Sequence, residues 1–189
     1  MARDLALLEG SGSVLRLYSW DRPTVSLGYS QRWTPSELPW VRRPTGGRAL
    51  LHTRDEITYA IALDVGDVRV DEAFCYLTGT LREALNALGV PVTCSGLKRS
   101  GGGSESCLAL VQRGELLLGE RKLVGSAQAR RGGRLLQHGA IPFFPSHEQH
   151  ERVFGEVPPV VGMGVRMRPE ELAEEWGRTL GVTWGESVG

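Results

Sequence analysis

The chain has 189 residues, 41% of them hydrophobic and 23% charged, and its formal net charge is zero. These values indicate one globular domain with its own core, and they exclude the basic field that nonspecific nucleic-acid binding needs. The sequence shows no secretory leader and no apolar run of about 18 residues that could cross a membrane. Its three cysteines are too few for a disulfide framework. We therefore expect a cytoplasmic protein with reduced thiols that binds neither nucleic acid nor membrane.

The first half of the chain predicts a short helix, several strands and one long helix. The helix covers residues 4–9, and the strands cover 14–20, 24–28, 49–52 and 57–63. The last of these strands is apolar on both faces and rich in β-branched residues, which is typical of a central strand. Residues 36–40 predict a loop or a single helical turn. Apolar residues recur at helical spacing over 71–88, with Asp71 as N-cap and Gly89 as the stop.

The second half predicts further antiparallel strands and a last helix. A short strand covers 91–94 and a flexible loop 95–106, followed by strand-like runs over 107–112, 115–126 and 134–143. Turn residues at 113–114 and 131–133 join these runs into a meander. Residues 145–159 are expected to be irregular, and 169–180 to form an amphipathic helix. The predicted fold class is therefore α+β, with a mixed, mainly antiparallel sheet flanked by helices.

The segment from 42 to 48 combines two glycines with three arginines. Gly46 and Gly47 let backbone N–H groups approach a ligand closely. Arg42, Arg43 and Arg48 can hold a carboxylate or a phosphate through paired hydrogen bonds. From these residues alone, an ordinary glycine turn on a basic surface is the favoured interpretation, because an isolated glycine loop is a weak signal.

Three further segments carry side chains suited to chemistry. Lys122 precedes the small residues Gly125, Ser126 and Ala127, which leave room for a ligand against the backbone, and its ammonium could stabilise developing negative charge. The alternative is a solvated lysine at a strand edge.

Gln137, His138 and Gly139 interrupt an otherwise apolar strand, where buried polar groups either satisfy the core or face a site. Cys107 follows the glycine-rich loop, where substrate can reach a thiol and a nearby cation would favour the thiolate. Cys75 and Cys94 are typical of small core residues.

Taken together and in this order, these segments resemble the superfamily of lipoate–protein ligases, octanoyltransferases and biotin–protein ligases. The resemblance covers roughly residues 1–144. It is carried by the opening Met-Ala-x-Asp, by Trp20 with the run 24–31, and by the Arg-Arg-Pro-Thr-Gly-Gly-Arg, Lys-Leu-Val-Gly-Ser-Ala-Gln and Leu-Gln-His-Gly segments. It implies a single catalytic domain of the biotin/lipoate ligase type over 1–189, lacking the usual first strand and with a shortened C-terminal region.

Three details resemble the cysteine-dependent octanoyltransferase branch. Arg48 replaces a third glycine, the run 55–59 follows His52, and Cys107 lies fifteen residues before Lys122. The resemblance implies that Cys107 is the nucleophile and that Lys122 lies near the acyl carbonyl. It implies a substrate-binding set of Arg42, Arg43, Gly46, Gly47, Arg48, His52, Gly125, Ser126, Ala127, Gln137, His138 and Gly139, and no metal ligand.

The implied reaction is a ping-pong transfer of an octanoyl or lipoyl group through a Cys107 thioester. The donor would be an acyl carrier protein or the glycine-cleavage H protein, and the acceptor a lysine on a lipoyl domain of the 2-oxoacid dehydrogenases. This route requires no cofactor. One alternative is an ATP-dependent lipoate–protein ligase, which would use ATP and magnesium and would not need Cys107. Another is a non-catalytic protein that binds lipoyl domains or acyl lipids.

Overall fold

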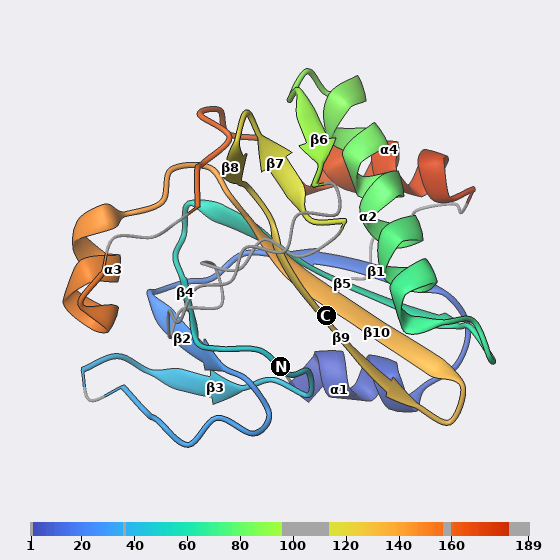
Figure 1. Ribbon diagram of the computed structural model, residues 1–189, viewed down its shortest axis with the longest axis horizontal. Helices are drawn as coiled ribbons and strands as arrows, with labels where there is room; N and C mark the ends of the chain where they lie inside the picture. Colours follow the sequence, from blue (N-terminus) through green and yellow to red (C-terminus); the bar gives the residue numbers. More distant parts are fainter. Residues whose placement is uncertain (1, 36, 96–113, 157–159, 182–189) are drawn as a thin grey trace.

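The computed structural model describes residues 2–35, 37–95, 114–156 and 160–181. Cys107 and the predicted strand over 107–112 lie outside the described residues. Within them, the chain forms three β-sheets surrounded by helices (Figure 1). The predicted α+β class is confirmed.

The largest sheet has the strand order β1-β5-β10-β9, and all its neighbours are antiparallel. Its strands are β1 (Val14–Tyr18), β5 (Glu56–Asp64), β9 (Gly125–Arg131) and β10 (Arg134–Pro142). The prediction that 57–63 forms a central strand is confirmed. Gly132 and Gly133 join β9 to β10 with φ of 57° and 77°, as a two-residue hairpin turn requires.

Two three-stranded sheets flank this central sheet. One has the order β3-β2-β4, from β2 (Thr24–Leu27), β3 (Trp40–Arg42) and β4 (Leu50–His52), and its β2–β3 pair is parallel. The other has the order β6-β7-β8, from β6 (Val92–Cys94), β7 (Leu116–Leu118) and β8 (Arg121–Lys122), and it is antiparallel.

Helices cover both faces of the central sheet (Figure 1). Helices α2 (Val70–Ala87) and α4 (Pro169–Leu180) pack on one face, where Tyr59 and Ile61 of β5 join the main core. Helix α1 (Ala2–Glu9) packs on the other face against Ala60 and Ala62. Successive side chains of a strand point to opposite faces, so β5 carries apolar residues on both faces from Tyr59 to Leu63.

A buried aromatic contact joins α4 to the sheet. The Trp176 ring meets the Tyr59 ring edge-on at a centroid distance of 5.0 Å, and its Nε1 donates to Thr80 Oγ1 on α2 at 2.9 Å. Strand β5 and helices α2 and α4 therefore each contribute one residue to this cluster, which fixes the two helices relative to the sheet.

Two predicted elements have different boundaries in the structure. The single strand predicted over 115–126 is instead β7, β8 and the start of β9. Gly119, with φ of 63°, turns the chain between β7 and β8, and Leu123 and Val124 leave the ladder to enter the core. Helix α2 begins at Val70 after an N-cap position at Arg69, so Asp71 is in the first turn and not the predicted N-cap.

Two further elements were not predicted. Residues 147–154 of the segment expected to be irregular form α3 (His147–Phe154), capped by Ser146, whose Oγ accepts from the Gln149 amide at 3.3 Å, and by Gly155 in the left-handed region. Strand β3 begins at Trp40, the end of the segment predicted as a loop or helical turn, because its ladder partner is the distant β2. No helix in the described part of the chain is long and apolar enough to cross a membrane.

The end of β2 lies against the glycine segment, residues 46–48. A substitution in this contact tests the backbone packing around the site. A Cβ placed on Gly28 would lie 1.8 Å from the Gly47 carbonyl oxygen. We expect Gly28→Ala to lower the free energy of unfolding by about 1–3 kcal/mol, because the backbone must move apart to admit the methyl group. Urea unfolding followed by tryptophan fluorescence measures this effect.

Gly46→Ala is the matched control in the same contact. A Cβ on Gly46 meets no atom within 4 Å among the described residues, so this variant should unfold close to the wild-type midpoint. Equal losses in the two variants would mean that the close approach does not constrain position 28.

Candidate functional site

A cavity lies between β4 and the β9–β10 hairpin, and we call it the His138 cavity. It is lined by Arg43, Arg48, Leu50, His52, Thr58, Gly125, Ser126, Ala127, His138 and Gly139. All of these except Leu50 and Thr58 belong to the predicted substrate-binding set. The structure therefore brings together the ends of three segments that lie far apart in the sequence.

Glycine lets the strands that form the floor of this cavity pack closely on Tyr59 beneath it. A Cβ on Gly139 would lie 2.5 Å from the Gly125 carbonyl oxygen and 2.7 Å from Tyr59 Cε1. The Tyr59 hydroxyl is 2.6 Å from Ser126 Oγ and accepts from Gln137 Nε2 at 3.2 Å. Burial raises the pKa of Tyr59 to about 12, opposed by these two hydrogen bonds, so the phenol keeps its proton at neutral pH. Gln137 thus supports the floor through Tyr59 and is not among the residues that line the cavity.

His138 joins the cavity wall to helix α1. Its Nε2 is 2.6 Å from Thr45 Oγ1, and its Nδ1 is 3.5 Å from Asp4 Oδ2. Burial lowers the pKa of His138 below its usual 6.5, more strongly than the carboxylate of Asp4 raises it. Burial also opposes ionisation of Asp4, but contacts with His138 and Tyr18 outweigh this effect and lower the pKa of Asp4. The pair is therefore a neutral imidazole beside a buried carboxylate.

Two adjacent arginines bind backbone carbonyls. The buried Arg43 guanidinium donates to the carbonyls of Ser26 at 2.8 Å, Gly46 at 3.0 Å and Arg48 at 2.8 Å. Arg42 extends to the other side of the segment and donates to the carbonyls of the turn over 28–31, at 2.9 Å for Gly28. Arg43 borders both the His138 cavity and a separate groove beside α1, whereas Arg42 borders only the groove.

Arg48 and His138 each bring a buried nitrogen without a hydrogen-bond partner among the described residues, NH1 of Arg48 and Nδ1 of His138. A buried N–H without a partner is unfavourable, and that of Arg48 belongs to a guanidinium on the wall of a cavity. An oxygen acceptor on a bound ligand would satisfy this N–H.

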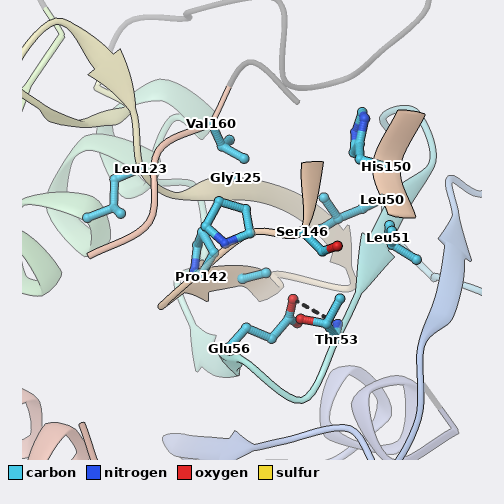
Figure 2. Close-up of a pocket in the computed structure, with 12 residues that line it drawn as sticks. Leu50, Leu51, Thr53, Glu56, Leu123, Gly125, Pro142, Ser146, His150 and Val160 are labelled. Atoms are coloured by element: carbon cyan, nitrogen blue, oxygen red, sulfur yellow. Dashed lines mark hydrogen bonds between the residues drawn. The ribbon is translucent and has the colours of Figure 1, made fainter. Parts of the chain in front are cut away.

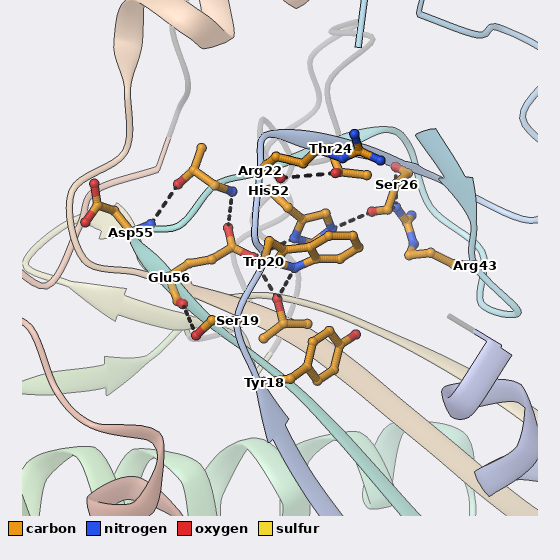
Figure 3. Close-up of polar contacts among 12 residues, drawn as sticks. Tyr18, Ser19, Trp20, Arg22, Thr24, Ser26, Arg43, His52, Asp55 and Glu56 are labelled. Carbon is orange, nitrogen blue, oxygen red and sulfur yellow. Dashed lines mark hydrogen bonds and ion pairs between the residues drawn. The ribbon is translucent and has the colours of Figure 1, made fainter. Parts of the chain in front are cut away.

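A hydrogen-bonded histidine, His52, forms part of the wall. His52 Nδ1 is 2.6 Å from Glu56 Oε1, and its Nε2 is 2.7 Å from Ser26 Oγ (Figure 3). The Trp20 indole stacks on the imidazole at a centroid distance of 4.4 Å and donates from Nε1 to Thr58 Oγ1 at 2.8 Å. The imidazole is therefore held at both nitrogens and on one face.

Lys122 is buried on β8 and does not extend into solvent, which excludes the solvated strand-edge alternative. Its ammonium pairs with the carboxylate of Glu115, and both side chains are about 95% buried, with 3% and 5% of their surfaces exposed. The next residue, Leu123, lines a second cavity. The distance from Lys122 to Cys107 stays a prediction, because Cys107 lies outside the described residues.

The second cavity shares a wall with the first, and we call it the His150 cavity (Figure 2). Leu50 and Gly125 border both cavities. Its other lining residues are mostly apolar, with polar groups from Thr53, Glu56, Ser146 and His150. Gly46 and Gly47 border a third, open hollow together with Glu115, Ser126, Ala127 and Gln128, so the predicted set is distributed around β9.

Comparison with known proteins identifies the family. The family described as "Lipoyl protein ligase A/B catalytic domain" matches residues 1–182 of this chain. The chain belongs to this family. The predicted superfamily is therefore confirmed, over a longer part of the chain than the motifs alone covered.

Among curated relatives, this lipoyl protein ligase A/B domain is similar to proteins named Octanoyltransferase LipM. It is 40% identical over 165 residues to that of Moorella thermoacetica, covering 75% of this chain and 59% of that protein. It is 36% identical over 184 residues to that of Carboxydothermus hydrogenoformans, covering 81% and 68%. The chain thus spans only part of the length of these relatives.

Solved structures share the fold of this family domain. A lipoate-protein ligase A bound with ATP superimposes with a TM-score of 0.80 at 22% identity, covering 98% of this chain and 81% of the other. A T. acidophilum protein with bound lipoic acid gives 0.80 at 21%, with the same coverage. A biotin acetyl coenzyme A carboxylase synthetase from Helicobacter pylori gives 0.51 at 15%, covering 95% and 66%. These likenesses confirm the predicted biotin/lipoate ligase type of fold.

Sequence reasoning missed Glu56, Ser26 and Thr58 as parts of this site. Each is a polar residue in an otherwise apolar strand and is buried, with 4%, 0% and 2% of its surface exposed. That pattern is the same signal that singled out Gln137 and His138, and it could have indicated all three.

The buried histidine gives the domain a pH-dependent stability. Because the folded state lowers the pKa of His138, the unfolded chain binds a proton more readily just below pH 6.5. The free energy of unfolding should therefore fall as the pH drops from 6.5, by at most about 1.4 kcal/mol per pH unit for one histidine. Urea unfolding at pH 7.5 and 5.5 measures this loss.

His138→Gln should lose less stability between these pH values than the wild type. The slope should not vanish, because burial also lowers the pKa of His150. His147→Gln, which removes an exposed histidine, is the control. An unchanged slope in His138→Gln would contradict the assignment.

Proposed function

We propose that this domain transfers an octanoyl or lipoyl group from a carrier protein to the lysine of a lipoyl domain through a thioester on Cys107. The observation that carries the proposal is the 34–40% identity to proteins named Octanoyltransferase LipM. We place the reaction in the cytoplasm, where thiols remain reduced.

The His138 cavity is the proposed site for the acyl chain. Its glycine floor and the side chains of Leu50 and Ala127 offer an apolar surface, and burying methylene groups there favours binding by about 0.8 kcal/mol each. The free N–H of Arg48 is suited to donate to the acyl carbonyl oxygen. The chain would enter with its carbonyl toward the positively charged wall.

The two chemical steps balance without an added cofactor. The Cys107 thiolate attacks the carrier thioester, the carrier sulfur leaves as a thiol after taking a proton, and the acyl group remains on Cys107. The lysine amine of the lipoyl domain then attacks this thioester, forming an amide and releasing the Cys107 thiol. Lys122, paired with Glu115, supplies a fixed positive charge that stabilises the negative charge formed in both steps.

An ATP-dependent ligase is the competing function. The ATP-bound lipoate-protein ligase A shares the fold at 22% identity, which supports ATP use in that protein. For this chain, ATP and magnesium are required only if an acyl-adenylate replaces the carrier thioester as donor. Transfer from a thioester with ATP omitted separates the two functions.

The central experiment detects the covalent intermediate. Incubation with octanoylated carrier protein, without ATP, should add one octanoyl group to the intact mass, and hydroxylamine should remove it. Cys107→Ala should not be labelled, whereas Cys75→Ser should be labelled like the wild type. Labelling of Cys107→Ala, or transfer to the lipoyl domain only when ATP is present, would overturn the proposal.

The role of Lys122 has its own test. Lys122→Met should slow acylation of Cys107 by about 10²-fold or more, which is typical for loss of a preorganised positive charge. Because this variant leaves a buried carboxylate without its partner, Lys122→Met/Glu115→Gln should be measured as well. Glu115→Gln alone keeps the ammonium and is the control. A wild-type acylation rate in the double variant, measured by quenched mass spectrometry, would exclude a role for the charge.

A further inference from the structure

A chain of four buried polar side chains runs along the wall of the His138 cavity, which two of its members, Arg43 and His52, line (Figure 3). Glu56 Oε1 is 2.6 Å from His52 Nδ1, His52 Nε2 is 2.7 Å from Ser26 Oγ, and Ser26 Oγ accepts from Arg43 NH1 at 2.9 Å. The exposed fractions are 4% for Glu56, 2% for His52, 0% for Ser26 and 6% for Arg43. Such a continuous buried chain needs an explanation, because burying a carboxylate and a guanidinium is unfavourable unless each is fully hydrogen-bonded.

The chemistry of its two ends gives the chain a direction. A guanidinium can only donate, and an ionised carboxylate can only accept. For a neutral imidazole, one set of protons satisfies every link: Arg43 donates to Ser26, Ser26 donates to His52 Nε2, and His52 donates from Nδ1 to Glu56. This tautomer is assigned from the hydrogen-bond partners.

The carboxylate end is firmly anchored. Besides His52, Glu56 accepts from Thr58 Oγ1 at 2.7 Å and from the Thr53 amide at 3.4 Å. Glu56 begins β5, the strand at the centre of the main sheet. Trp20 covers the imidazole of His52 and bonds to Thr58, so the ring cannot turn away from the carboxylate without breaking several contacts.

The guanidinium end holds the glycine segment. NH1 of Arg43 contacts Ser26, while NH2 donates to the carbonyls of Gly46 and Arg48. These carbonyls set the path of the backbone that carries the Arg48 side chain to the cavity wall. A displacement of Arg43 would therefore also displace the Arg48 side chain at the cavity wall.

We propose that Glu56 is a positioning residue for the reaction, acting through His52, Ser26 and Arg43 to hold the segment 46–48 against the cavity. The kinetic part of this inference rests on the proposed acyl transfer. Glu56 touches no reacting atom in this account. It fixes the tautomer of His52 and, through it, the orientation of the serine hydroxyl that receives Arg43.

The first test is kinetic. Glu56→Gln retains the shape of the side chain but removes its charge and replaces one acceptor oxygen with a donor. We expect kcat/KM for octanoyl transfer to fall about 10–100-fold, as small misplacements near a reacting group do. Ser26→Ala should have a similar effect, and the double variant should be no slower than the slower single variant, because both break the same chain.

Thr80→Val is the matched control. It removes a buried hydrogen bond of similar length, from Trp176 to Thr80 at 2.9 Å, in the core away from this chain. It should lower stability with kcat/KM unchanged. If Glu56→Gln and Thr80→Val lose stability alike and both retain wild-type kcat/KM, Glu56 is merely structural and the inference is wrong.

The second test is spectroscopic and does not depend on activity. Imidazole ¹⁵N resonances of His52 should report an Nδ1–H tautomer in the wild type and a change in Glu56→Gln. The backbone amides of Gly46, Gly47 and Arg48 should shift in Glu56→Gln and in Ser26→Ala, but not in Thr80→Val. Unshifted amides would overturn the inference even if Cys107 proves to be acylated. Shifted amides would support the positioning role of Glu56 even if acyl transfer fails.

Discussion

A buried guanidinium has to find enough acceptors to replace water, and in this domain that requirement shapes the site. Arg43 meets it with backbone carbonyls from two segments, at Ser26 and at Gly46 and Arg48. The contact holds the end of β2 against the glycine segment so closely that a side chain at Gly28 would meet the Gly47 carbonyl. Glycines that look suited to phosphate or carboxylate binding therefore also serve backbone packing.

The central strand β5 serves the core and the site at the same time. On one face Tyr59 and Ile61 pack against the helices, and Trp176 fixes one of those helices to the ring of Tyr59. On the other face Thr58 lines the His138 cavity. The hydroxyl of Tyr59 reaches Ser126 at the cavity floor. The same strand therefore supplies side chains to the core and to the cavity.

Much of the architecture was predictable because its signals are local. The apolar repeats of the two long helices, the two glycines between β9 and β10 and the doubly apolar β5 each depend on neighbours in sequence. Strand β3 depends on pairing with the distant β2, and the bond between Thr45 and His138 joins residues 93 positions apart. The motifs indicated most of the cavity lining, but the support from Glu56 depends on contacts that only the folded chain creates. The place of Cys107 relative to Lys122 stays a prediction.

Leu50 and Gly125 form the shared border of the two cavities, one from β4 and the other from β9. Since Gly125 contributes main chain only, the one side chain on this border among the described residues is that of Leu50. Any substitution at position 50 changes both spaces together. A change confined to one space must then come from a residue that borders that space alone, such as Thr58 or Val160.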